Sequence, residues 1–108
     1  MDWKKLNEID QIDQIIQESE QHPIVIFKHS TSCPVSGSAK KRLESVPAPE
    51  NVDFYYLDLW TYRSVSDEVA ERMNVTHKSP QVLLIKNGKC VYNESHQKVN
   101  MDAIVEQL

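Results

Sequence analysis

Cys33 lies in a polar segment, residues 30–36, between an apolar run at 23–27 and a helix-like stretch at 37–46. Pro34 suits the first position of a helix, because its missing N–H would have no partner there. Cys33 is therefore expected to precede the helix directly. A thiol at that place faces free backbone amides and the positive end of the helix dipole, and both stabilise a thiolate. The sequence predicts a nucleophilic sulfur at the junction of a strand and a helix.

The spacing around this cysteine limits its chemistry. In Cys33-Pro34-Val35-Ser36 the fourth position is a serine, whereas a dithiol oxidoreductase carries a second cysteine there. Thiol–disulfide exchange passes through a mixed disulfide. We therefore expect Cys33 to take up one half of a substrate disulfide and then to react with an outside thiol. Two roles stay open for Ser36: its hydroxyl hydrogen-bonds the thiolate, or it only satisfies the backbone of the first turn.

The elements that would position Cys33 follow from the spacing of apolar residues. Helical spacing predicts helices at residues 3–19, 35–46, 62–73 and 101–108, and β-branched and aromatic runs predict strands at 24–29, 52–59, 81–86 and 89–93. Asn87-Gly88 predicts a tight hairpin between the last two strands. Pro80 belongs at the start of its strand, because it cannot donate to a ladder. A βαβ unit followed by a ββα unit is the thioredoxin-like α/β arrangement.

The residues around Cys33 also resemble a known family. Ser32-Cys33-Pro34-Val35-Ser36 resembles the TCPIS-type motif of the monothiol bacilliredoxins, the YtxJ-like group of the thioredoxin superfamily, with Ser32 and Val35 in place of threonine and isoleucine. Ser79-Pro80 resembles the cis-proline loop of that superfamily, and residues 86–89 resemble its hairpin. The resemblance covers nearly the whole chain. It implies one thioredoxin-like domain over residues 1–108, with a mixed central sheet flanked by helices.

The resemblance implies a function as well. It implies a thiol–disulfide oxidoreductase that removes bacillithiol from mixed disulfides on client proteins, with bacillithiol as the thiol co-substrate. The implied site has catalytic and substrate-binding members: Cys33 and Ser36 are catalytic, and Ser32, Pro34, Val35, Ser79 and Pro80 bind substrate. A cis Pro80 would present the backbone of Ser79 beside Cys33, where it pairs with an incoming chain as a short strand.

Two alternatives from other classes remain open at this stage. The first is a monothiol glutaredoxin-like iron–sulfur carrier, because proteins of that type can hold a cluster between two subunits, with one cysteine from each and a small thiol. Visible colour that depends on Cys33 would favour that carrier. A non-catalytic thioredoxin-like adaptor, in which Cys33 merely packs, is the second alternative. Slow alkylation of the thiol at all pH values would favour the adaptor.

Composition restricts the partners. Twelve lysines and arginines stand against 16 aspartates and glutamates, and the net charge of −4 provides no general field for nucleic acid or an anionic membrane. The longest apolar runs have four residues, at 24–27 and 82–85, far short of the roughly 20 that a membrane span needs. Two cysteines without an apolar signal segment favour a reducing compartment, so we expect a cytoplasmic protein. We also expect a monomer.

Several other polar residues are weaker candidates. Cys90 is predicted to be a buried, inert cysteine, because a strand at about 3.3 Å per residue would carry it roughly 20 Å from the site, and a disulfide needs Cα atoms within about 7 Å. For His29, a role as a cation or base near Cys33 is weighed against a position facing solvent at the strand end, and the second is favoured for both His29 and Lys28. Lys40, Lys41 and Arg42 are predicted to form a solvated helix face. For Trp60 and Tyr62, a groove wall and core packing both stay open. Paired-cysteine spacing is absent, and we expect no metal.

Overall fold

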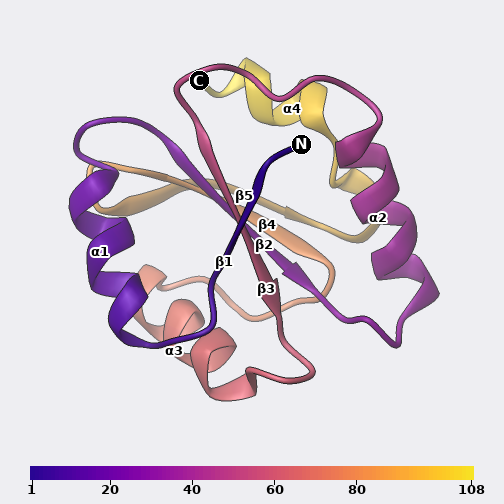
Figure 1. Cartoon of the computed structure of the whole chain (residues 1–108), viewed down its shortest axis with the longest axis horizontal. Coiled ribbons are helices and arrows are strands. Elements are labelled where there is room, and N and C mark those ends of the chain that lie inside the picture. Colours follow the sequence, from indigo (N-terminus) through magenta and orange to yellow (C-terminus); the bar gives the residue numbers. More distant parts are fainter.

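The computed structural model describes residues 1–108, and its elements follow the predicted order with one addition at the start (Figure 1). The strands are β1 Trp3–Lys5, β2 Ile24–His29, β3 Asp53–Asp58, β4 Gln81–Lys86 and β5 Lys89–Ser95. The helices are α1 Asp10–Glu18, α2 Pro34–Glu44, α3 Arg63–Met73 and α4 Met101–Glu106, and a 3₁₀ turn, η1, covers His96–Lys98. The mixed sheet flanked by helices is confirmed.

The five strands form one sheet in the order β1-β3-β2-β4-β5. β1, β3 and β2 are parallel, β4 pairs antiparallel with β2, and β5 pairs antiparallel with β4. β2 is therefore a central strand with a neighbour on each side, which explains why its whole length is buried. The predicted hairpin after β4 is confirmed, since Asn87 and Gly88 both have positive φ, at 51° and 76°.

Two apolar cores cover the two faces of the sheet. α1 and α3 pack on one face and α2 and α4 on the other, as Figure 1 shows. Side chains alternate along β2: Ile24 and Ile26 enter the first core, and Val25 and Phe27 enter the second. This alternation sends Lys28 and His29, the last two residues of the strand, to opposite faces.

The predicted helix at residues 3–19 is wrong in its first third. Trp3 to Lys5 pair with Phe54 to Tyr56 as a parallel edge strand, and α1 begins only at Asp10. The indole of Trp3 stacks on Phe27 at 5.7 Å, and this aromatic contact favours the strand over a helix. Ile9, which the helical pattern included, is 43% exposed.

One edge of the sheet gathers the segments that form the candidate site. His29 pairs with Asp58, so β2 and β3 end together at this edge. Gln81, the first residue of β4, pairs with Ser95, the last residue of β5. Four segments therefore start or end at this same edge: the loop with Cys33, the loop after β3, the segment before β4, and η1. The longest helices, α2 and α3, have 11 residues each, so none of the helices reaches the length and apolar character of a membrane span.

Candidate active site

Cys33 occupies the position that the sequence predicts. It directly precedes α2 with extended backbone angles, φ −108° and ψ 118°, and Pro34 is the first helical residue. Its carbonyl accepts the first helical hydrogen bond, from the N–H of Gly37 at 3.1 Å. The thiol is half-buried and free, and its sulfur makes no capping hydrogen bond. The sulfur is thus open to a second sulfur beside the unpaired amides of the first helical turn.

Ser36 lies inside the protein and bonds to β2. Its Oγ is 2.6 Å from Nδ1 of His29 and accepts a hydrogen bond from the N–H of Ser30 at 3.0 Å. The tautomer of the imidazole sets the direction of the first bond: the Ser36 hydroxyl donates to an unprotonated Nδ1, or a protonated Nδ1 donates to Oγ. A bond from Ser36 to the Cys33 sulfur, one of the two roles left open by the sequence, is not among the hydrogen bonds of the structure. A catalytic role for Ser36 stays a prediction.

The prediction that His29 faces solvent is wrong. Its side chain is 6% exposed, and its ring packs against Phe27 and Tyr56. Burial lowers the pKa of His29, and the positive charge of Lys40 lowers it further. The lowered pKa favours the neutral imidazole at pH 7. A sequence signal existed, since His29 ends a run that is otherwise wholly apolar apart from Lys28.

We expect the free energy of unfolding to decrease as the pH falls below about 6.5. Burial lowers the pKa of both His29 and His77 in the folded chain, so below this pH the unfolded chain binds protons that the folded chain resists. Replacing His29 with glutamine should flatten this decrease, because glutamine keeps a polar partner for Ser36 without titrating. Urea denaturation at pH 7.5, 6.0 and 5.0 measures the effect. An equal decrease in the variant would contradict a buried neutral His29.

Lys28 is also misplaced by the sequence prediction. Its side chain is 0% exposed on the opposite face of the sheet, where Nζ donates to the carbonyl of Ser66 at 3.1 Å and lies 3.2 Å from Nδ1 of His77. Burial lowers the pKa of Lys28 to about 8. Lys28 is expected from the sequence to face solvent, but the loop that carries His77 covers the end of β2. The local sequence around Lys28 does not reveal a contact with so distant a segment.

The segment before β4 contains a cis peptide bond between Ser79 and Pro80. The carbonyl of Pro80 accepts a hydrogen bond from the N–H of His96 at 2.9 Å, which ties this loop to η1. The backbone of Ser79 makes no hydrogen bond within the chain, and its buried Oγ has no partner either. This loop therefore has unused backbone donors and acceptors at the edge of the sheet that carries Cys33.

The remaining candidate residues lie on the surface of the protein. Ser32 is exposed, with Oγ 3.1 Å from Oγ of Ser30. Pro34 is exposed, and Val35 is 46% exposed. Trp60 is 69% exposed beyond the end of β3, so core packing is excluded for it. Exposed Pro34 and Val35 therefore place apolar surface directly after Cys33 in the chain.

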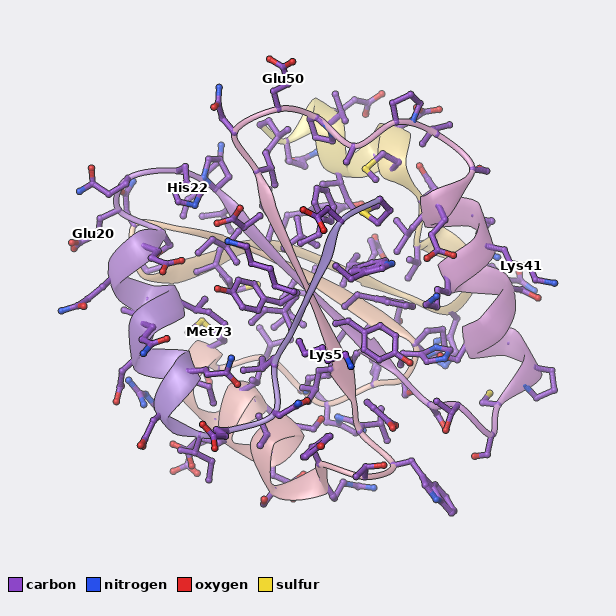
Figure 2. The ribbon with its side chains drawn as sticks, in the orientation of Figure 1. Lys5, Glu20, His22, Lys41, Glu50 and Met73 are labelled. Carbon is purple, nitrogen blue, oxygen red and sulfur yellow. The ribbon has the colours of Figure 1, made fainter.

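Of the three basic residues in α2, one is free and two are engaged. Lys41 is exposed and points away from the protein, as Figure 2 shows. Lys40 pairs with Glu44 at 3.0 Å. Arg42 donates to the carbonyls of His96 and Val99, at 2.8 and 3.0 Å, and so fastens η1 to the helix. The predicted solvated face holds for Lys41 and is wrong for Arg42.

Cys90 lies at the opposite edge of the sheet. It pairs with Ile85, which pairs with Ile24 at the start of β2, whereas Cys33 follows the end of that strand. The length of β2 alone corresponds to roughly 16 Å, beyond the reach of a disulfide. Cys90 packs against the first core, and burial raises the pKa of its thiol. Both the separation and the burial oppose a resolving role.

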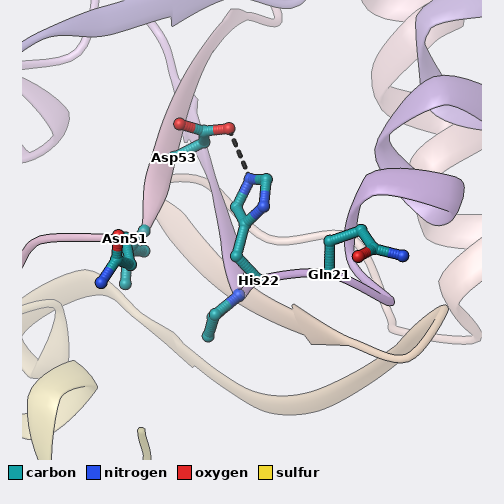
Figure 3. Close-up of a pocket in the computed structure, with 6 residues that line it drawn as sticks. Gln21, His22, Asn51 and Asp53 are labelled. Atoms are coloured by element: carbon teal, nitrogen blue, oxygen red, sulfur yellow. Dashed lines mark hydrogen bonds and ion pairs between the residues drawn. The ribbon is translucent and has the colours of Figure 1, made fainter.

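A hollow of about 570 Å³ also lies at that opposite edge (Figure 3). Figure 3 shows His22 reaching toward Asp53, with Nε2 at 2.7 Å from Oδ2. One ligand atom each of Glu18, His22 and Asp53 lies within 4.8 Å of the others, a cluster that sequence reasoning missed. The ammonium of Lys4 lies 3.2 Å from the same Asp53 oxygen and neutralises the charge that a cation would need. The hollow is remote from Cys33.

Comparison with known proteins agrees with this geometry. Residues 4–104 match the model of the family described as monothiol bacilliredoxin BrxC. A solved structure assigned as an oxidoreductase with a thioredoxin fold is 34% identical, with a TM-score of 0.83, and the match covers 94% of this chain and 89% of that one.

Two thioredoxins share the fold at lower identity. Thioredoxin from Malassezia sympodialis is 18% identical with a TM-score of 0.74, over 98% of this chain and 87% of that one. Thioredoxin from Fasciola hepatica is 21% identical with a TM-score of 0.70, over 96% and 94%. With one free thiol at the start of α2 and serine at the fourth position of the motif, the chain is a thiol oxidoreductase that belongs to the monothiol bacilliredoxin family.

Proposed function

We propose that the protein removes bacillithiol from mixed disulfides on client proteins, with Cys33 as the nucleophile. The observation that carries the proposal is the half-buried free thiol at the start of α2, three residues before a serine that cannot form a disulfide with it. The family match supports bacillithiol as the small thiol. The reaction requires a reduced Cys33, a condition that the cytoplasm maintains.

The first step is one thiol–disulfide exchange. The Cys33 thiolate attacks the bacillithiol sulfur of the mixed disulfide, the bond from bacillithiol to the client breaks, and the client cysteine leaves as a thiolate. The new disulfide joins Cys33 to bacillithiol. A second low-molecular-weight thiol then attacks the bacillithiol sulfur, which returns Cys33 as a thiolate and releases a small disulfide. Electrons balance in both steps, because each forms one S–S bond and breaks one.

We further propose that the loop with Ser79 and Pro80 binds the client beside Cys33. The free backbone groups of Ser79 support this role, because an extended client segment that pairs with them adds a short strand. Exposed Val35 supplies an apolar contact near the sulfur, and exposed Ser32 and Pro34 flank Cys33 in the chain. Ser36 acts through its bonds to β2, which hold the first turn of α2 in place.

The test compares two small thiols on one model protein. A protein with a single cysteine is modified with bacillithiol or with glutathione, and the release of each is followed by mass spectrometry. We expect bacillithiol to leave at least about tenfold faster, a preference equivalent to 1.4 kcal/mol. Equal rates would contradict the assignment of bacillithiol, and no release of either would contradict the oxidoreductase reaction in this form.

A further inference from the structure

A second hollow, of about 520 Å³, lies directly beside the candidate active site. It is lined by residues of α2, of the loop before β4, and of the end of β5 with η1: Val35, Lys78, Glu94, Ser95, His96, Gln97 and Lys98. Val35 is the second residue after Cys33, and Lys78 is the second residue before Pro80. A small molecule attached to the Cys33 sulfur would therefore have this hollow next to it. Its volume is in the range of small-ligand sites.

The charge of this hollow is opposite to that of the whole chain. Lys78, His96 and Lys98 contribute three basic side chains against Glu94 alone, in a protein with a net charge of −4. Neither the Lys78 nor the Lys98 ammonium has an ion-pair or hydrogen-bond partner, although Lys4 and Lys40 each pair with a carboxylate. Two unpaired ammonium groups beside the start of α2 form a local positive field.

The backbone that carries these charges is held in place. The N–H of His96 donates to the carbonyl of Pro80 at 2.9 Å, so η1 is fixed to the loop that carries Lys78. On its other side, Arg42 of α2 donates to the carbonyls of His96 and Val99. α2, the loop and η1 thus form one connected frame around the hollow. A ligand would meet backbone that is already positioned, which reduces the entropic cost of binding.

We propose that this hollow binds the carboxylates of the small-molecule half of the mixed disulfide. The site accordingly selects a low-molecular-weight thiol with two negative charges, one for Lys78 and one for Lys98. This inference rests on the proposed function, because it assumes that Cys33 attacks the sulfur of the small thiol. It adds the residues that recognise the charged groups of that thiol, which the motif around Cys33 does not determine.

The test uses one cysteine-containing peptide joined by a disulfide to mercaptosuccinate, 2-mercaptoethanol or cysteamine. These thiols carry two negative charges, none and one positive charge. The rate constant for transfer to Cys33 is measured by quenched intact-mass spectrometry. We expect the Lys78→Gln/Lys98→Gln variant to lower the mercaptosuccinate rate about tenfold relative to the 2-mercaptoethanol rate, because two screened charge contacts are lost. The cysteamine rate should rise. The three disulfides differ in intrinsic reactivity, but this difference is the same for every protein variant. It therefore cancels when the rate for each peptide is divided by the wild-type rate for the same peptide.

The matched control removes two lysines elsewhere. Lys41→Gln/Lys89→Gln changes the net charge equally, since both side chains are exposed and lie outside the hollow. This control variant should keep the wild-type ratio of the mercaptosuccinate rate to the 2-mercaptoethanol rate. If the control lowers the ratio as much, or if Lys78→Gln/Lys98→Gln keeps it, the carboxylate site is wrong while thiol transfer by Cys33 stands. If Cys33 accepts no thiol from any of the peptides, both proposals fail together.

Discussion

Replacing Cys33 with serine is expected to abolish thiol transfer from a modified client. The sulfur at the start of α2 is the nucleophile of the proposed first step, and a serine hydroxyl at the same place forms no disulfide. We expect the rate to fall by at least about a thousandfold, as for the loss of other catalytic nucleophiles. Release of the small thiol from the client, followed by mass spectrometry, measures the effect.

The control for this variant is Cys90→Ser, which removes the other thiol. Cys90 pairs with Ile85 at the remote edge of the sheet, and its burial makes it a poor nucleophile. Its replacement should leave the rate of transfer within about twofold of wild type, since it contacts no part of the candidate site. A loss of transfer in Cys90→Ser, with folding intact, would show that the remote thiol takes part and would contradict the monothiol reaction.

Replacing Lys28 with methionine is expected to stabilise the fold. The Lys28 side chain is fully buried, with hydrogen bonds but no carboxylate partner. Burial lowers its pKa from 10.5 to about 8, a difference that corresponds to roughly 3 kcal/mol of cost for the charged form. Methionine has a similar length and no charge. We expect the free energy of unfolding at pH 7 to rise by about 1–3 kcal/mol, measured by urea denaturation.

The same lysine predicts a dependence on alkaline pH. Between pH about 8 and 10.5 the unfolded chain keeps the Lys28 proton and the folded chain releases it, so the free energy of unfolding should rise with pH in this window. The Lys28→Met variant should lack this contribution, and the exposed control Lys41→Met should keep it. If Lys28→Met instead loses more than about 1 kcal/mol at pH 7, the bonds to Ser66 and His77 outweigh the cost of burial.

The regular elements could be predicted because their signals are local. The alternating and helical spacing of apolar residues located β2 to β5 and α2 to α4 within a few residues, and Pro34 marked the start of α2. Asn100 likewise caps α4, with its side chain accepting a hydrogen bond from the N–H of Ala103 at 2.8 Å. Each of these signals acts within one or two turns of chain, where the sequence alone determines the outcome.

The residues that were misplaced depend on distant contacts. Trp3 joins an edge strand because Phe27 and Phe54 of the sheet receive its ring. His29 and Lys28 are buried because α2 and the loop that carries His77 cover the end of β2. Only the folded chain brings these partners together. For the same reason the hollow between Lys78 and Lys98 was not predicted, since its walls come from three separate segments.

The most direct test of the account is the intact mass of the protein after it is mixed with a bacillithiolated model protein. The reduced wild type should gain one bacillithiol on Cys33 while the model protein loses one. Cys90→Ser should gain the same adduct, and Cys33→Ser should gain none. Transfer that persists in Cys33→Ser, or a wild type that gains no adduct while the model protein stays modified, would contradict Cys33 as the nucleophile of a monothiol bacilliredoxin.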